Sequence, residues 1–357
     1  MIISVKKFLF VVTKSSIGGA QMFIVEQTKM LVENGHEVFL ITNKDGWLTQ
    51  KLIHILKNVY VHRGIEKLTS PSFCYKVYKF VKLNKIDLVI CNSANAGLYG
   101  RVGAFLANKP SIYVSHGWSS LYNGGKLAFL YNFIEYLLSF ISNSILCVSK
   151  NDYATAVNKL GINSNKCSYI PNAISSVSIN PANSNSNLKF KLVTVCRLDH
   201  PKLPFLLVNS VKEMSDFDLT IVGGGPLLND LKKYIYKNDI SNVKLLGELN
   251  DFSDYSNFDI FCLISKSEGL PISAIEAMSF SLPLVLSNVG GCLELINNNG
   301  FVVSNDIDSI QDAIRKCSLE YSKFSLNSLI HFNNNFNINK LSQRYLDYYI
   351  NVVKKSA

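Results

Sequence analysis

The segment at residues 175–187 reads SSVSINPANSNSN and divides the chain into two parts. It is rich in Ser and Asn, contains one Pro and has no hydrophobic periodicity, which is typical of a linker. Short apolar runs alternate with longer amphipathic stretches on both sides of it. We therefore expect a domain at residues 1–175, a linker at 176–188, a second domain at 189–336, and a C-terminal helix at 337–357 that packs back on the first domain.

The apolar runs predict strands at residues 8–12, 37–41, 87–91, 111–115 and 145–149, and then at 191–196, 218–222, 243–246, 259–264 and 283–287. Helices are predicted between them, for example at 20–34, which Gly35 ends, and at 226–238. Apolar strands separated by helices indicate parallel sheets covered on both faces. The predicted fold class is α/β, with two doubly wound, Rossmann-like domains facing a central cleft. Ligands of such sheets bind beyond the carboxyl ends of the strands.

Composition narrows the kinds of partner. Lys and Arg exceed Asp and Glu by 36 − 26 = 10, which favours an anionic partner such as a phosphorylated ligand or an acidic membrane surface. The chain has no dense Lys/Arg run and no nucleic-acid motif, so we do not expect it to bind nucleic acid. Its eight Cys show no C-x-x-C spacing, which indicates buried thiols in a reducing compartment rather than disulfides or zinc.

Two glutamates stand in the run SEGLPISAIEAM at residues 267–278. Glu268 lies in a Gly/Pro turn, and Glu276 lies on the helix that Pro271 can open. A helix N-terminus suits a phosphate group, and an ionised carboxylate accepts hydrogen bonds from hydroxyls. Phosphate and hydroxyl groups side by side describe a sugar nucleotide, whereas a solvated carboxylate on a helix surface is the alternative for Glu276.

Two cations follow the first strand of the second half. Arg197 and Lys202 stand in the run CRLDHPK at residues 196–202. A planar guanidinium and a point-charged ammonium at a strand's carboxyl end can clamp a diphosphate. From spacing alone, two solvated surface cations are an equal alternative.

Glycines and a histidine mark further strand ends. Gly18 and Gly19 open a predicted helix, where backbone N–H groups can approach an anion, or where an ordinary tight turn suffices. The run GGGP at residues 223–226 lacks the G-x-G-x-x-G spacing, so a nicotinamide site is disfavoured. His116 ends a predicted strand and is followed by Gly117, which favours a place in the cleft over a purely structural one.

These motifs, in this order, resemble the retaining family-4 glycosyltransferases of GT-B architecture, also called glycosyl transferases group 1. The resemblance covers most of the chain and is most specific in the second half, where it continues through LPLV at residues 282–285 and VGG at 289–291. One departure is Ser281, which stands where a Gly is common. Another is Gly117, which follows His116 where an Asp is often found.

The resemblance implies a role for each motif. Arg197 and Lys202 would neutralise the donor diphosphate and the leaving group, Glu276 would bind the ribose hydroxyls, and Glu268 would contact the transferred sugar. His116 would also contact the sugar, so the implied catalytic residues are His116, Glu268, Arg197 and Lys202. The implied donor-binding residues include these last three and also Gly18, Gly19, Gly225, Leu249, Gly269, Leu270, Pro271, Ile272 and Glu276.

The resemblance also implies the substrates. The donor would be a nucleotide sugar, with a UDP-sugar ahead of a GDP-sugar, and no metal or other cofactor is expected. The acceptor would be a saccharide, such as one linked to polyprenyl diphosphate, in the assembly of a bacterial surface polysaccharide such as O-antigen, lipopolysaccharide or capsule. No protein nucleophile is assigned. A sugar-nucleotide epimerase or hydrolase on the same fold and a non-catalytic nucleotide-sugar-binding protein are the alternatives.

The stretch at residues 127–141 is apolar nearly all round if it is helical. We expect a buried helix of the first domain, because helices that are apolar on every side usually pack inside. The alternative is an element that faces a membrane, helped by the basic net charge. The expected location is the cytoplasm, with peripheral association at the inner face of the cytoplasmic membrane.

Overall fold

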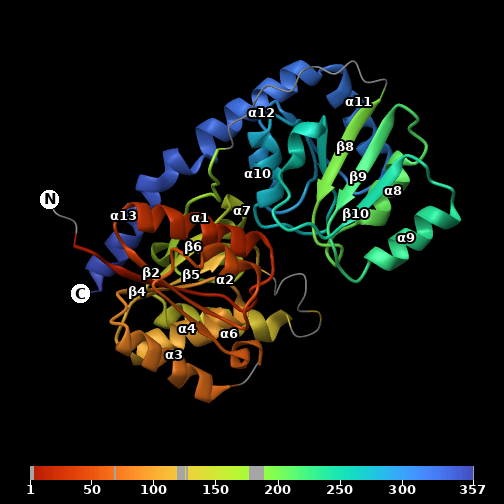
Figure 1. The fold of residues 1–357 in the computed structure, drawn as a ribbon. Coiled ribbons are helices and arrows are strands. Elements are labelled where there is room, and N and C mark those ends of the chain that lie inside the picture. The colour runs from red at the N-terminus through yellow and green to blue at the C-terminus, as the bar shows by residue number, and fades with distance from the viewer. Residues whose placement is uncertain (1–3, 68–69, 119–124, 126–127, 177–188, 357) are drawn as a thin grey trace. The chain divides into compact units, whose positions relative to one another are not determined.

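The computed structural model describes residues 4–67, 70–118, 125, 128–176 and 189–356 (Figure 1). The chain divides into two compact units, unit 1 with residues 1–172 and 341–357, and unit 2 with residues 173–340. The predicted linker lies outside the described residues from residue 177 to its end, and so does residue 127 of the apolar stretch.

Unit 1 is built around a parallel sheet with the strand order β3-β2-β1-β4-β5-β6-β7, and Figure 1 shows helices along it. Its strands are β1 (Lys7–Val11), β2 (Glu37–Thr42), β3 (Asn58–Val61), β4 (Leu88–Cys91), β5 (Ser111–Ser115), β6 (Ser144–Cys147) and β7 (Cys167–Tyr169). Its helices are α1 (Gly19–Glu33), α2 (Trp47–Leu52), α3 (Pro71–Leu83), α4 (Ala94–Leu106), α6 (Ala128–Ile141) and α7 (Lys150–Asn158), together with most of α13 (Ile338–Lys355).

Strand β1 shows why both faces of this sheet are covered. Leu9 and Val11 are fully buried in one hydrophobic cluster, which also contains Phe73 of α3. Phe8 points the other way, and its ring lies 6.0 Å from the ring of Tyr349 of α13. Because successive side chains of a strand alternate between faces, a strand covered on both sides must be apolar throughout.

Unit 2 has a parallel sheet with the order β10-β9-β8-β11-β12-β13. Its strands are β8 (Phe190–Val195), β9 (Phe217–Val222), β10 (Val243–Gly247), β11 (Ile260–Leu263), β12 (Leu284–Ser287) and β13 (Gly300–Val303). Its helices are α8 (Pro204–Val211), α9 (Leu228–Lys237), α10 (Ile272–Ser279), α11 (Ile307–Leu319) and α12 (Tyr321–Asn335), with a short 3-10 helix, η4 (Asp254–Asn257), before β11.

The predicted fold class is confirmed, with two doubly wound parallel sheets. All ten predicted strands are present, and the described part of the chain has three further strands, β3, β7 and β13, that were not predicted. All three lie at sheet edges. Their side chains are only partly buried, and their apolar runs are no longer than three residues, too short to indicate a strand by themselves.

Helix α13 contacts unit 1 through three tyrosine hydroxyls. Tyr345 donates to the carbonyl of Pro171 at 2.7 Å, and Tyr349 donates to Oε1 of Gln27 at 3.0 Å. Tyr348 donates to Oγ of Ser144 at 2.8 Å. The last helix of the chain therefore belongs with the first sheet.

Helix α6 differs from the expected buried helix. Only Glu135, Leu138 and Ser139 are buried. The large apolar side chains point outward, and Phe129 is 82% exposed. The other exposed members are Leu130, Phe133, Tyr136, Leu137 and Phe140. The prediction of a buried helix was wrong, because an all-apolar pattern does not distinguish a helix inside a core from one that presents an apolar surface.

Candidate active site

The site in unit 2 forms where the strand order reverses. The chain winds outward from β8 through β9 to β10 and then returns to place β11 on the other side of β8. The loops that follow β8 and β11 are therefore neighbours, and Lys202 in the first loop pairs with Ser265 in the second through a backbone bridge. Ligands of doubly wound sheets bind at such switch points.

Lys202 and Glu268 meet at this point. The Nζ of Lys202 forms a hydrogen-bonded ion pair with Oε1 of Glu268, and both side chains are largely buried. Burial opposes the charge of Lys202, but the Glu268 carboxylate outweighs it and raises the pKa of Lys202 above its ordinary value. Lys202 is therefore a permanently charged ammonium, already partnered by the first predicted glutamate.

Arg197 lies in the same loop but faces solvent. Its side chain is 64% exposed, and Nη2 lies 3.6 Å from Oδ2 of Asp199. An exposed pair of this kind is weak and easily exchanged for a better anion. The two predicted cations thus differ, with one fixed in a buried pair and one available at the surface.

Glycines allow the neighbouring loops to pack closely. A Cβ atom on Gly223 would lie 1.8 Å from the carbonyl oxygen of Cys196, and one on Gly225 would lie 2.3 Å from that of Leu198. Both glycines also have positive φ angles, 146° and 144°. The glycine run after β9 therefore has a structural task, which is to let its backbone pack against the loop that carries Arg197 and Lys202.

Gly290 does the same for the loop that carries Glu268. A Cβ atom there would lie 1.8 Å from the carbonyl oxygen of Glu268. The next N–H, of Gly291, donates to the carbonyl of Gly269 at 2.8 Å. These contacts hold the loop that carries Glu268 against the turn after β12.

The second predicted glutamate lies on α10, which begins at Ile272 directly after Pro271. The first backbone N–H groups of a helix have no acceptor within the helix, so this end is suited to an anion. Leu270 and Ile272 are buried and fix the turn. Glu276 is half-buried, and Tyr255 of η4 donates its hydroxyl to Oε2 of Glu276 at 2.8 Å. The sequence pattern did not single out Tyr255, because it stands alone in a short 3-10 helix outside every motif.

The predicted residues of unit 1 lie at the start of helix α1 and just after strand β5. Gly18 precedes α1 and Gly19 begins it, and a Cβ atom on Gly19 would meet nothing within 4 Å. His116 follows β5, and its Nε2 lies 3.0 Å from Oδ1 of Asn92, which follows β4. Burial lowers the pKa of His116 to about 3, so its imidazole is neutral near pH 7.

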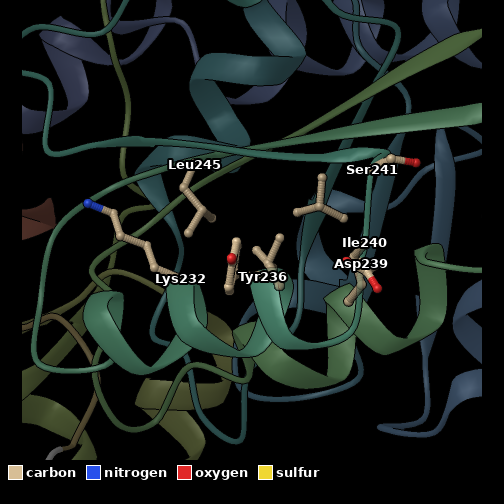
Figure 2. A pocket seen from close by; sticks show the side chains of 8 residues that line it. Lys232, Tyr236, Asp239, Ile240, Ser241 and Leu245 are labelled. Atoms are coloured by element: carbon tan, nitrogen blue, oxygen red, sulfur yellow. The ribbon is translucent and has the colours of Figure 1, made fainter.

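Leu249 is exposed and follows the turn at Gly247, whose carbonyl accepts from the N–H of Gly223 at 2.7 Å. A cavity of about 520 Å³ lies farther along this sheet edge, between α9 and β10. Figure 2 shows its lining, which includes Lys232, Tyr236 and Leu245. None of the predicted site residues lines it. Within the described ranges, no group of three or more His, Cys, Asp or Glu side chains is placed to hold a metal ion.

Fold and site together define a class of protein. The chain has two doubly wound units. In unit 2 a buried ammonium and a carboxylate pair at the switch point, and the helix that follows carries a second carboxylate. Such groups suit an anionic ligand that carries hydroxyl groups. Two family models match the chain, "Glycosyltransferase Family 4" at residues 17–176 and "Glycosyl transferases group 1" at residues 178–325.

The chain belongs to this glycosyltransferase family, as predicted, and is a glycosyltransferase of GT-B fold. It is 42% identical over 315 residues to the O-antigen biosynthesis glycosyltransferase WbnH of Escherichia coli, covering 88% of this chain and 91% of that one. It is 29% identical to the E. coli UDP-Gal:alpha-D-GlcNAc-diphosphoundecaprenol alpha-1,3-galactosyltransferase, covering 94% and 95% of the two chains.

Solved structures show the same fold. The structure of Anabaena HepE in complex with UDP and glucose superposes with a TM-score of 0.82 at 19% identity, covering 96% of this chain and 99% of that one. No helix in the described part of this chain has the length and hydropathy needed to cross a membrane.

Proposed function

We propose that this glycosyltransferase moves a sugar from a UDP-sugar to a lipid-diphosphate-linked saccharide, with retention, in O-antigen biosynthesis. The buried ion pair of Lys202 and Glu268 at the switch point of unit 2 is the observation that carries this proposal. It places a cation suited to a diphosphate next to a carboxylate that accepts hydrogen bonds from sugar hydroxyls. The names of the E. coli relatives and the UDP bound to HepE support the donor, the acceptor and the pathway.

The proposed roles follow from the chemistry of each group. Lys202 and Arg197 neutralise the diphosphate as negative charge develops on the leaving group. The backbone N–H groups of Gly269, Leu270 and Ile272, just before and at the start of α10, assist them, whereas Pro271 has no N–H and shapes the turn. Glu268 accepts hydrogen bonds from the transferred sugar, and Glu276 accepts them from the ribose hydroxyls.

The remaining predicted residues complete the donor contacts. Gly225 and the backbone at Leu249 belong to the nucleotide side. Gly18 and Gly19 offer backbone N–H groups to the diphosphate, because the open space at Gly19 admits close approach. His116 is neutral, and its hydrogen bond with Asn92 holds the ring in place, so it contacts the sugar as a hydrogen-bonding group rather than as a cation.

A panel of nucleotides tests the donor. UDP is expected to raise the melting temperature, because a ligand that binds only the folded state stabilises it. GDP, ADP and CMP serve as comparisons. Stabilisation by GDP but not by UDP would overturn the assignment of the base.

Product analysis separates the alternatives. With a UDP-sugar and a polyprenyl-diphosphate-linked saccharide, UDP release should depend on the acceptor and yield a longer saccharide. Equal release of UDP without acceptor would indicate a hydrolase, and an isomerised sugar nucleotide would indicate an epimerase. Binding of UDP with none of these products would indicate a non-catalytic protein.

The exposed face of α6 supports a membrane contact. Phe129, Phe133 and Phe140 stand at helical spacing on one side of the helix and reach solvent. Helix α6 packs against α4, which packs against α3, and α3 carries Lys76, Lys79 and Lys82 with no acidic residue. An exposed aromatic helix and a basic helix in the same unit suit an anionic membrane surface. We propose that unit 1 attaches the enzyme to the inner face of the cytoplasmic membrane, where a lipid-linked acceptor lies.

Vesicle co-sedimentation tests this surface. The double variant Phe129→Ser/Phe133→Ser should bind vesicles containing anionic lipid at least about threefold more weakly than the unchanged protein, because two buried aromatic groups are lost. The matched control is Leu319→Ser/Leu326→Ser, which removes two exposed leucines of unit 2. Equal loss in both variants would contradict the assignment of the surface to α6.

A further inference from the structure

Glu276 is held by a side chain that no sequence motif contains. The Tyr255 hydroxyl donates to Oε2 of Glu276 at 2.8 Å. The phenol is 1% exposed, so water cannot easily replace it. This hydrogen bond fixes one oxygen of a half-buried carboxylate, a group that accepts hydrogen bonds from hydroxyls.

The Tyr255 ring is itself locked in place. Its centroid lies 5.1 Å from that of Phe252, at 73°, and 5.4 Å from that of Phe280, at 31°. Phe261 of β11 lies 6.3 Å away. Packing on three sides leaves the hydroxyl a single direction, so the ring acts as a rigid support for the carboxylate.

Tyr255 also stays protonated. Burial, with the nearby Glu276 charge as a second cause, raises the pKa of the phenol well above its ordinary value. Near neutral pH it is therefore protonated and donates a hydrogen bond to the carboxylate.

We propose that Tyr255 is a positioning residue that sets the specificity of this site for ribonucleotides over 2′-deoxyribonucleotides. The proposal rests on the proposed ribose role of Glu276. A vicinal diol presents two donors at fixed spacing, and a carboxylate meets both only when its plane is fixed. Tyr255 fixes that plane. A 2′-deoxyribonucleotide lacks one of these two hydroxyl donors, so fixing the plane of the carboxylate increases its affinity less.

The test compares the affinities of UDP and 2′-deoxy-UDP by calorimetry in the full-length chain. Tyr255→Phe keeps the ring and removes only the hydroxyl. UDP should bind it roughly three- to tenfold more weakly, as for one lost hydrogen bond, whereas 2′-deoxy-UDP should change by less than about twofold. With a UDP-sugar, the donor KM should rise while kcat holds, because the lost contact lies far from the reacting bond.

Two further variants make the result decisive. Tyr234→Phe removes another tyrosine hydroxyl of unit 2, which donates to Asn209 at 2.6 Å, and it should leave both affinities unchanged. In a Glu276→Ala background, Tyr255→Phe should have no further effect on UDP binding, since the carboxylate it positions is gone.

The outcomes separate this proposal from the one on which it rests. If Glu276→Ala leaves the preference for UDP over 2′-deoxy-UDP intact, the ribose role of Glu276 fails. If Glu276→Ala abolishes the preference but Tyr255→Phe weakens both nucleotides equally, or neither, the positioning role of Tyr255 is overturned. Melting curves of each variant identify any general loss of folding.

Discussion

The charge balance around Lys202 decides how the donor site handles a diphosphate. Lys202 is already paired with Glu268, so part of its positive field is cancelled before any ligand arrives. A carboxylate beside a diphosphate site lowers affinity for the anion. The cost is acceptable if the same carboxylate holds the transferred sugar, because interactions that favour the transition state raise the rate even when ground-state binding is weaker.

Glu268→Gln is therefore expected to separate binding from transfer. The neutral amide no longer cancels the Lys202 charge, so UDP should bind roughly three- to tenfold more tightly, about 1 kcal/mol of Coulomb energy. Transfer should fall by roughly tenfold or more, because the sugar loses a charged hydrogen-bond acceptor. Calorimetry with UDP and steady-state rates with a UDP-sugar measure the two effects.

Asp199→Asn is the matched control. It removes the carboxylate beside Arg197, but this pair is exposed, at 3.6 Å, so solvent screens it and UDP affinity should change by less than about twofold. Weaker UDP binding by Glu268→Gln would show that the carboxylate supports the diphosphate site instead of opposing it.

Ser281 has a backbone conformation that Gly adopts more easily than Ser. It has φ +64° and follows Phe280, the C-cap of α10, and its N–H donates to the carbonyl of Met278 at 3.0 Å. Helices often end on a residue in this left-handed conformation, usually Gly, since a Cβ atom is disfavoured there. The departure from the family pattern noted in the sequence therefore falls on a strained backbone.

Ser281→Gly is expected to stabilise unit 2 by about 0.5–1 kcal/mol, after the entropic cost of glycine is subtracted. Urea titration followed by circular dichroism measures it. Ser279→Gly makes the same substitution at the last residue of α10, where it also removes a hydroxyl that donates to the carbonyl of Glu276 at 2.6 Å, and should destabilise by about 1 kcal/mol. A loss of stability in Ser281→Gly would show that the Ser side chain has contacts that outweigh the strain.

For single residues, the sequence identified charged side chains of the candidate site but not the side chains with which they pair. Lys202 and Glu268 were found because each follows a central strand, where the fold collects functional groups. Their direct pairing was not foreseen, because it depends on β11 lying beside β8, whereas the chain reaches β11 only after two other strands. Tyr255 was missed for a similar reason, since its partner is 21 residues away and neither spacing nor hydrophobicity marks it.

Among the elements, α6 shows the limit of hydrophobic patterns. Its sequence is equally compatible with a core helix and a surface-presenting one. The structure has one buried polar contact that orients it, since Nη2 of Arg101 on α4 lies 2.8 Å from Oε2 of Glu135. Arg101 is fully buried, and its guanidinium carbon also lies 4.3 Å from the centroid of the Tyr113 ring. The single acidic residue of α6 thus faces inward and the aromatic residues face outward.

Glu135→Ala is expected to destabilise unit 1 by about 3–5 kcal/mol, because it leaves the Arg101 charge buried without its carboxylate. Both tryptophans of the chain, Trp47 and Trp118, lie in unit 1, so their fluorescence in urea reports on this unit. Lys57→Ala is the control in the same unit: it breaks a solvent-exposed pair with Glu37 at 3.6 Å and should cost less than about 0.5 kcal/mol.

Replacing both partners distinguishes the pair from simple packing. Arg101→Met/Glu135→Leu should recover most of the stability lost in Glu135→Ala, since apolar residues of similar volume need no compensating charge. If the double variant were as unstable as the single one, the hydrogen bonds of Arg101, including the one to the carbonyl of Gly97 at 2.7 Å, would be the larger contribution.

For the whole molecule, the two units carry different functional groups. Unit 2 carries the charged groups proposed for the donor, and unit 1 carries the exposed aromatic helix and a basic helix. The chain as a whole has a net charge of +10. A net positive charge attracts a protein to an anionic membrane surface. Burial of an exposed apolar face in the membrane then strengthens the binding.

Salt is therefore expected to weaken membrane binding without abolishing it. Raising NaCl from about 50 mM to about 500 mM shortens the range over which charges act from more than 10 Å to a few Å. Binding to vesicles with anionic lipid should fall several-fold, as each lysine near the surface contributes roughly 1 kcal/mol at low salt. The residual binding at high salt should disappear in Phe129→Ser/Phe133→Ser, because it depends on aromatic burial. Vesicles of neutral lipid should capture only this residual amount of protein at either salt concentration, because they lack the charge that attracts the lysines. If binding changed with neither the NaCl concentration nor the charge of the lipid, the lysines of unit 1 would have no part in it.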